Sequence, residues 1–230
     1  MNTKQKLSPI VSQSVPSWPI YQAVTVGCLG ILATLAVTLW AATTFPREEL
    51  SHRDFLAIET ILECVASVGV VCLFLVIAWK LPLRDFWDSI HWQWKSSKIA
   101  VCSIIGILSS VLMHYALARN LVIGPNSSTT GVIVAIGIGT IILQPLLEEV
   151  YFRGILFESL SFKMSSVWSI SIVTALFVLM HAQHHWIILP IAILLAVTRV
   201  ATRSTACCFA LHAAYNLGMV VWDLSSAMVG

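Results

Sequence analysis

Residues 147–154 read Leu-Glu-Glu-Val-Tyr-Phe-Arg-Gly and place two adjacent carboxylates and an arginine inside an otherwise apolar stretch. A charged side chain near the centre of a bilayer costs roughly 2.5–3.5 kcal/mol on insertion scales. If the stretch crosses a membrane, Glu148, Glu149 and Arg153 therefore need compensating partners. These three residues are the starting point for both the fold and the function.

Helix geometry supplies part of the compensation. Glu149 and Arg153 are four residues apart, so they lie on nearly the same helix face and can form an ion pair. Glu148 points roughly 100° away from that pair and stays available to a substrate, a water or a metal. An alternative is that the three charges only cap and neutralise a helix end at the interface. We favour the first interpretation because ionisable residues inside a membrane are functional by default.

The composition is that of a membrane protein. Of the 230 residues, 58% are hydrophobic and 10% are charged, and the mean hydropathy is +0.87. Several apolar runs approach the roughly 20 residues that span a bilayer, so we predict an all-α transmembrane bundle of about seven helices, with a range of six to eight. The predicted helices cover residues 21–45, 55–79, 99–118, 131–147 (with a possible continuation to about 160), 167–183, 186–201 and 205–222.

The runs form one integral membrane domain, in which residues 1–130 are leading helices and residues 131–222 carry the polar motifs. The loop of residues 80–98 holds three tryptophans and is expected to form a short interfacial helix. The six cysteines show no C-x-x-C spacing and are predicted to be packing residues.

Lys and Arg counts predict the orientation, because cytoplasmic loops carry the excess of these residues. With the N-terminus inside, the inner segments hold nine of them, Arg199 and Arg203 included, and the outer segments hold three. We therefore predict a multi-pass protein of the plasma (inner) membrane with a cytoplasmic N-terminus. The net charge of +2, without a basic cluster, gives no sign of nucleic-acid binding.

Two further polar patterns follow on later predicted helices. Phe177 lies one turn before His181 on the same face, where an aromatic ring would fix the imidazole. His212 and Asn216 are also one turn apart and project together from the last predicted helix. Each polar group in lipid needs a partner, so we expect the groups of the three helices to converge. Convergent carboxylates and imidazoles are the usual means of activating water.

In this order, the motifs E-E-x-x-x-R, F-x-x-x-H and H-x-x-x-N resemble the CAAX protease and bacteriocin-processing family of intramembrane proteases. That family includes type II CAAX prenyl endopeptidases and proteins similar to lysostaphin resistance protein A. The resemblance covers about residues 131–220. It implies an all-helical bundle whose site opens within the membrane. It also implies cleavage of a peptide bond near the membrane-associated end of a prenylated or hydrophobic substrate, with membrane lipid as the surrounding partner.

The resemblance also implies roles for the motif residues. Glu148 would be the general base that takes a proton from the attacking water, with Glu149 and Arg153 holding it in position. His181 and His212 would orient that water or polarise the site, and Asn216 would donate a hydrogen bond to the oxyanion. If a metal is bound, His181, His212 and Glu148 could hold zinc as a His₂Glu site.

No cofactor is certain from the sequence. No H-E-x-x-H motif is present, and the family has been described with both metal-dependent and glutamate-dependent members, so we favour metal-independent chemistry. A different class of function is a non-proteolytic membrane factor, such as a bacteriocin self-immunity or partner-stabilising protein. Haem ligation by two histidines is a third reading, but haem needs neither the glutamate pair nor the asparagine.

The depth of the site poses a difficulty for straight helices with these boundaries. Glu148 and His212 would lie nearer the cytoplasmic side and His181 nearer the outer side, a mismatch of roughly two helical turns. Either Pro145 breaks the fourth predicted helix so that Glu148 starts a second half-helix, or that helix runs long and tilted to about residue 160. Without one of these the site does not assemble.

Overall fold

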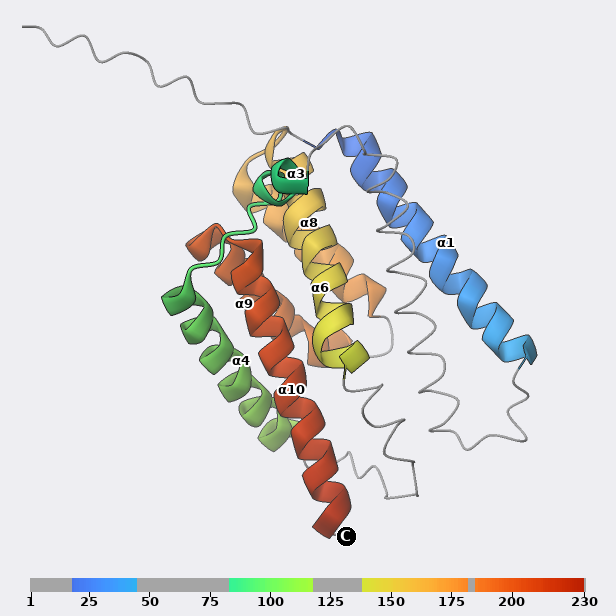
Figure 1. The fold of residues 1–230 in the computed structure, drawn as a ribbon, viewed down its shortest axis with the longest axis vertical. Helices are drawn as coiled ribbons and strands as arrows, with labels where there is room; N and C mark the ends of the chain where they lie inside the picture. Colours follow the sequence, from blue (N-terminus) through green and yellow to red (C-terminus); the bar gives the residue numbers. More distant parts are fainter. Residues whose placement is uncertain (1–17, 45–82, 118–137, 182–184, 230) are drawn as a thin grey trace, which may run out of the picture.

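The computed structural model describes residues 18–44, 83–117, 138–181 and 185–229. Within these ranges the fold is built of helices without strands, which confirms the predicted all-α class (Figure 1). The elements are α1 (Ile20–Thr44), α3 (Leu83–Ser89), α4 (Ser96–Leu117), η1 (Gly139–Leu143), α6 (Gln144–Glu148), η2 (Glu149–Leu156), α7 (Phe157–Ser161), α8 (Ser166–Met180), α9 (His185–Thr202) and α10 (Thr205–Val229).

Most of the helices lie where the apolar runs predicted them. α1, α4, α8 and α9 begin and end within a few residues of the predicted bounds, and α10 continues beyond its predicted end to Val229. α3 is the short helix expected in the tryptophan-rich loop. The predicted helix at 55–79 lies outside the described residues. The division into leading helices and motif-bearing helices stays a prediction.

One long helix carries both glutamates. Its segments η1, α6, η2 and α7 follow one another from Gly139 to Ser161, and the residues at their junctions have right-handed helical backbone angles. At 1.5 Å per residue this helix is roughly 34 Å long, enough to cross a hydrocarbon core of about 30 Å. Of the two solutions to the depth difficulty, the structure therefore has the long helix, which places Glu148 near its middle.

Pro145 does not break this helix, because the turn before it is wide. In a regular α-helix a proline ring collides with the carbonyl four residues earlier and removes a hydrogen bond. η1 is instead a π-helical turn, in which the N–H of Gln144 bonds to the carbonyl of Gly139 five residues earlier. A second π-helical stretch, η2, contains Glu149 and Arg153. Such turns are frequent at functional sites.

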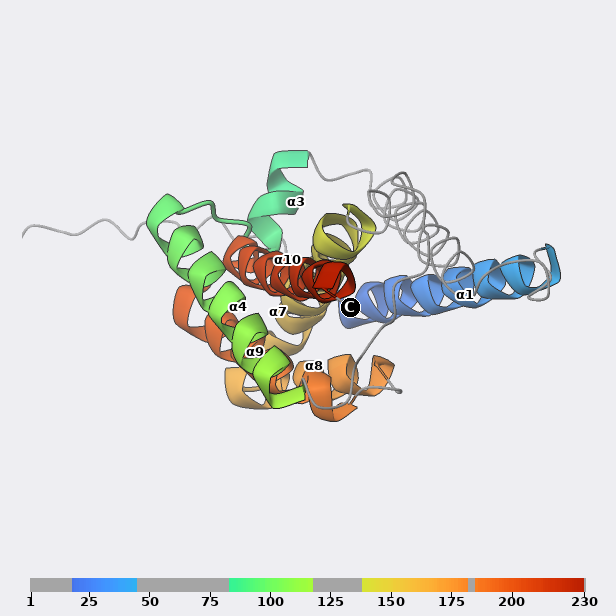
Figure 2. The ribbon, with the colours of Figure 1, turned by 90° about the horizontal axis from the view of Figure 1, so that it is seen from below.

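α10 lies near the middle of the bundle, where it contacts α4, α9 and the long helix (Figure 2). Its most extensive packing is against α4, because small residues face the neighbouring helix at two levels. The backbone of Leu211 leaves no room for a Cβ at Gly106, and the side chain of Ser110 leaves none at Gly218. Small residues let helices approach closely in membrane proteins. This approach fixes α10 at the level of His212, the neighbour of Leu211.

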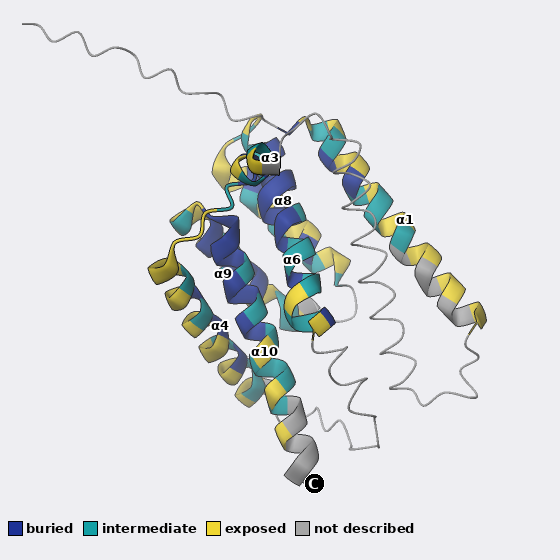
Figure 3. Ribbon diagram, viewed as in Figure 1, coloured by how far each residue is buried: buried dark blue, intermediate teal, exposed yellow. Residues whose placement is uncertain are grey.

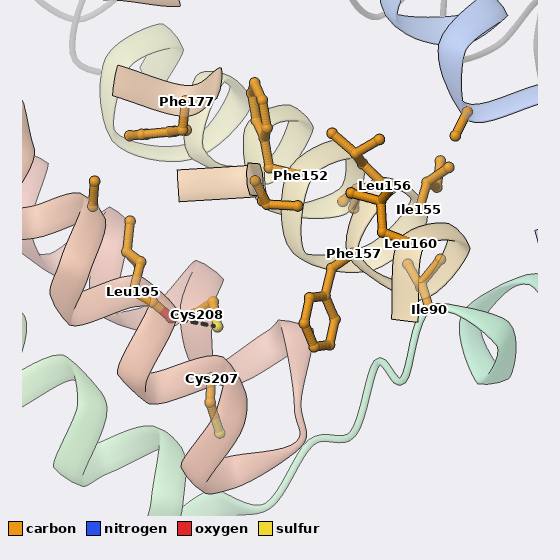
Figure 4. Packing of buried hydrophobic residues seen from close by; sticks show 14 of the residues in the cluster. Ile90, Phe152, Ile155, Leu156, Phe157, Leu160, Phe177, Leu195, Cys207 and Cys208 are labelled. Carbon is orange, nitrogen blue, oxygen red and sulfur yellow. Dashed lines mark hydrogen bonds between the residues drawn. The ribbon is translucent and has the colours of Figure 1, made fainter. Parts of the chain in front are cut away.

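The buried apolar core surrounds the long helix, and the outward faces of α1 and α4 are exposed (Figure 3). The rings of Phe152 and Phe177 meet edge to face with centroids 5.2 Å apart. The free thiols of Cys207 and Cys208 are fully buried, and the thiol of Cys208 lies 3.6 Å from the carbonyl oxygen of Leu195 (Figure 4). These two cysteines therefore act as packing residues, as the sequence predicted.

Two chain reversals meet at one end of the bundle. His91, between α3 and α4, and Arg203, between α9 and α10, both have a φ of 53°, in the left-handed region. The N–H of Thr205 donates to the carbonyl of His91 at 3.1 Å, and the hydroxyl of Ser204 donates to the carbonyl of Gln93 at 2.7 Å. The α3–α4 loop is thereby fastened to the start of α10.

Within the described residues, two helical stretches are long and apolar enough to cross a membrane, Ser96–Ala116 and Thr205–Trp222. Helices α8 and α9 and the first part of α1 are apolar but shorter by the same measure. Large apolar side chains such as Leu108, Leu112 and Tyr115 are exposed along α4, where lipid would solvate them. The chain is thus a membrane protein, and the number of its crossings and their orientation stay predictions.

Candidate active site

Glu149 and Arg153 form the ion pair expected from their spacing. The Nη1 atom of Arg153 donates to Oε1 of Glu149 at 3.0 Å, and both side chains are completely buried. The guanidinium also lies over the ring of Phe177, 4.1 Å from its centroid. A buried charge needs a partner and a favourable surrounding, and here the carboxylate and the aromatic face supply both. Oε2 of Glu149 and Nε and Nη2 of Arg153 are buried without a hydrogen-bond partner among the described residues.

His212 extends this pair to α10. Its Nδ1 lies 2.9 Å from Oε1 of Glu149, the same oxygen that Arg153 contacts. An ionised carboxylate only accepts hydrogen bonds, so Nδ1 of His212 is the donor. In the neutral imidazole, Nε2 then carries the lone pair. Glu149 therefore fixes both the orientation and the tautomer of His212.

Glu148 faces away from this pair, as its position on the helix predicted. Its Oε1 accepts a hydrogen bond of 3.0 Å from Nε2 of Gln144 and lies 3.7 Å from Nε2 of His181. Its Oε2 lies 3.9 Å from Nε2 of His212. That oxygen is buried without a hydrogen-bond partner among the described residues. The structure therefore brings both imidazoles to the first carboxylate, from α8 and α10.

The tautomer of His181 follows from a backbone contact. His181 is the residue directly after α8, and its Nδ1 lies 2.8 Å from the carbonyl oxygen of Phe177. A carbonyl can only accept, so Nδ1 donates and Nε2 keeps its lone pair towards Glu148. The ring of Phe177 lies 4.6 Å from the imidazole, centroid to centroid. Phe177 thus orients His181 through both its backbone and its ring.

Asn216 lies one turn beyond His212 and joins α10 to the first turn of the long helix. Its Nδ2 donates to the carbonyl oxygen of Thr140 at 2.9 Å. An amide nitrogen has two protons, so one donor remains for another acceptor. The role of this amide towards an oxyanion stays a prediction.

An apolar cavity of about 490 Å³ opens beside Glu148. Its walls come from three helices, α1, the long helix and α8, and Glu148 is the one carboxylate among the described lining residues. On α1 the wall includes Gly27, which faces the hydroxyl of Tyr151, and Gly30, which faces open space. The cavity therefore offers an apolar chain a path to a single acid.

The donor types around Glu148 are those that zinc takes in a His₂Glu site. Over residues 18–44, 83–117, 138–181 and 185–229, however, no group of three or more His, Cys, Asp or Glu side chains is close enough to hold an ion. The three groups meet around one carboxylate and do not form a closed ligand set. The metal dependence of the site stays a prediction.

Sequence reasoning missed a second buried charge cluster. It assigned Arg199 only to the positive-inside pattern and gave Glu158 no role, yet Arg199 is 2% exposed and pairs with Glu158. The signal was present, since Arg199 falls inside a predicted membrane helix and Glu158 inside the possible continuation of another. A charged side chain inside a membrane needs a partner, and this holds for Arg199 and Glu158 as it does for Glu148. Gln144 and Glu148 are four residues apart, so their contact could also have been predicted from the sequence.

The fold and the site define a class: an all-helical membrane protein with a buried centre of carboxylate and imidazole groups beside an apolar cavity. Residues 130–218 match the family model described as type II CAAX prenyl endopeptidase Rce1-like. Over these residues the match bears out the family that the three motifs predicted, and it contains all seven motif residues. The comparisons with curated proteins and with solved structures found no match.

Proposed function

We propose that the protein is a CAAX-type intramembrane endopeptidase that uses Glu148 to activate water. The family match supports protease activity of the CAAX type in general. The observation that carries the finer proposal is the convergence of the Nε2 atoms of His181 and His212 on the two oxygens of Glu148, at 3.7 and 3.9 Å. A water among these three groups would meet only acceptors, which is the environment that orients both of its protons.

In this proposal the three acceptors activate a water for hydrolysis of the peptide bond. Glu148 takes a proton from the water while the water oxygen attacks the carbonyl carbon of the scissile peptide bond. The other O–H of the water donates a hydrogen bond to Nε2 of one imidazole, His181 or His212, which aims the oxygen lone pair. The carbonyl becomes an oxyanion, to which Asn216 donates with the proton that Thr140 does not use. The C–N bond then breaks, and protonated Glu148 returns its proton to the leaving amine.

Glu149 and Arg153 take no part in proton transfer in this scheme. Their task is to keep His212 in place and in the correct tautomer, since Glu149 accepts from Nδ1 of His212 and Arg153 neutralises Glu149. Both side chains of the ion pair are completely buried. The two adjacent glutamates therefore divide the work between chemistry and positioning.

The cavity beside Glu148 supports a substrate with an apolar chain, prenylated or otherwise hydrophobic. Its described walls are aliphatic and aromatic, and burial of such a chain contributes about 0.8 kcal/mol per methylene. The scissile bond would then lie near the membrane-associated end of the substrate. In this proposal the protein crosses the membrane several times with its N-terminus in the cytoplasm.

A cleavage assay with purified full-length protein tests the proposal. The substrates are a prenylated peptide and its unmodified counterpart, and the variants are Glu148→Gln and His212→Ala. Both variants should lose cleavage, by roughly 100-fold or more for removal of the general base. The matched control is Asp88→Asn, an exposed carboxylate of α3 that should have no effect. Unchanged cleavage in both site variants would end the assignment.

Three further measurements refine the reaction class. A chelator should leave cleavage intact if the chemistry needs no metal, whereas loss that zinc restores would make the enzyme a metalloprotease. Substrate trapping with Glu148→Gln would identify the polypeptide that the cavity holds. A bacteriocin resistance that persists in Glu148→Gln would instead favour the non-proteolytic immunity function.

A further inference from the structure

Arg199 of α9 contacts the long helix at residues that do not line the cavity. Its Nε donates to the backbone carbonyl of Arg153 at 2.9 Å, and its Nη2 pairs with the carboxylate of Glu158. Its guanidinium also lies 4.9 Å from the ring centroid of Phe157. One buried side chain therefore contacts the long helix over residues 153–158, immediately after the two glutamates.

The contact with Arg153 falls inside the π-helical stretch η2. The N–H of Phe157 bonds to the carbonyls of Phe152 and Gly154. In a regular α-helix it would instead bond to the carbonyl of Arg153, four residues earlier. Arg199 supplies a donor to that carbonyl. Since the side chain of Arg153 holds Glu149, the contact supports the backbone directly behind the ion pair of the site.

Glu158 is held from its other side by the α3–α4 loop. Its Oε2 lies 3.4 Å from Nε2 of His91. The backbone of His91 is in turn bonded to Thr205 at the start of α10. The cluster of Arg199, Glu158 and His91 thus joins α9, the long helix and the helix that carries His212. None of the three lines the cavity beside Glu148.

We propose that Arg199 is a positioning residue for the candidate site. It fixes the π-helical stretch so that Arg153 presents Glu149 to Nδ1 of His212, and it does so without touching substrate. The proposal rests on the proposed function for its effect on catalysis, but its effect on geometry is independent of any activity. A residue that only stabilised the fold would lower the unfolding temperature and leave the Glu149–His212 contact unchanged in the folded protein.

The kinetic test compares Arg199→Lys and Arg199→Gln with Arg203→Gln. Arg203 is an exposed arginine one turn away and serves as the matched control. Arg199→Gln should lower kcat by about 100-fold, the effect of a small misplacement of catalytic groups. KM should stay unchanged because the cavity is untouched. Arg199→Lys keeps the charge without the guanidinium fork and should fall between wild type and Arg199→Gln.

The second readout is the proton on Nδ1 of His212, observed by NMR in full-length protein labelled with ¹⁵N-histidine and assigned by its loss in His212→Gln. The signal should shift in both Arg199 variants and stay in place in Arg203→Gln. A folded Arg199→Gln protein with an unshifted signal, or with wild-type kcat, would overturn the proposal. If Arg199→Gln does not fold, Arg199→Lys decides by the same measurements. If wild type cleaves nothing, the proposed function fails and the NMR shift alone decides.

Discussion

Nδ1 of His212 and Nη1 of Arg153 contact the same oxygen of Glu149, at 2.9 and 3.0 Å. One carboxylate therefore neutralises a buried guanidinium from its own helix and orients an imidazole from another. The chemistry proposed for Glu148 depends on this arrangement, because His212 presents Nε2 to Glu148 only while Nδ1 is held. Glu149 and Glu148 are adjacent in the sequence and lie at opposite nitrogens of the same imidazole.

Glu149→Gln should destabilise the protein and abolish cleavage. The amide leaves the fully buried Arg153 without its counter-charge, and breaking a buried pair costs about 3–5 kcal/mol. Thermal unfolding in detergent measures the loss. The double variant Glu149→Gln with Arg153→Met removes both charges and should regain most of the stability while remaining inactive. Full activity in that double variant would show that the pair has no part in the reaction.

The sequence was sufficient for most of the described helices and for the meeting of the two glutamates with His181 and His212, whose catalytic roles stay predictions. Apolar runs of bilayer length predicted the helix positions, because lipid imposes that length on every crossing helix. The helical period predicted the Glu149–Arg153 pair and the separate direction of Glu148. Both arguments use only residues that are close together in the chain, so they can be made from a single sequence.

Contacts between distant segments could not be read in the same way. The passage of the long helix through Pro145 depends on a wide turn that no propensity predicts. The bond from Asn216 to the carbonyl of Thr140, and that from Arg199 to the carbonyl of Arg153, involve backbone acceptors. Any residue type can supply such an acceptor, so the sequence carries no mark of it.

Phe177→Leu should reduce activity more than stability. The ring of Phe177 lies against Arg153 at 4.1 Å and against His181 at 4.6 Å, so it supports two site residues at once. Leucine keeps an apolar side chain but is smaller than the ring, so the loss of stability should be about 1–3 kcal/mol. The misplaced imidazole should lower kcat by roughly tenfold or more. Phe162→Leu, at an exposed position, is the control. The prediction would be wrong if Phe177→Leu and Phe162→Leu lost the same stability and the same activity.

Gly30→Leu should weaken substrate binding without disturbing the fold. A Cβ at Gly30 meets no heavy atom within 4 Å, and the residue lines the cavity beside Glu148. The added side chain would occupy space that the apolar substrate chain needs, so KM should rise by roughly tenfold. The unfolding temperature should stay the same or rise, since glycine is less favourable than leucine in a helix by about 1 kcal/mol. An unchanged KM would mean that the substrate enters elsewhere.

The close contact of α4 with α10 should tolerate the transfer of a small side chain from one helix to the other, but not the addition of one. Gly218→Ala places a methyl group against the side chain of Ser110, which is almost fully buried, and overpacking of this kind costs about 1–3 kcal/mol. Ser110→Gly removes the opposing atoms, so the double variant should regain the lost stability. The helix propensity of glycine largely cancels, because one glycine is lost from α10 and one is gained in α4. Thermal unfolding of the two single variants and the double variant measures the coupling. Additive losses would show that the two helices do not meet at this level, and the position of His212 on α10 would then need another explanation.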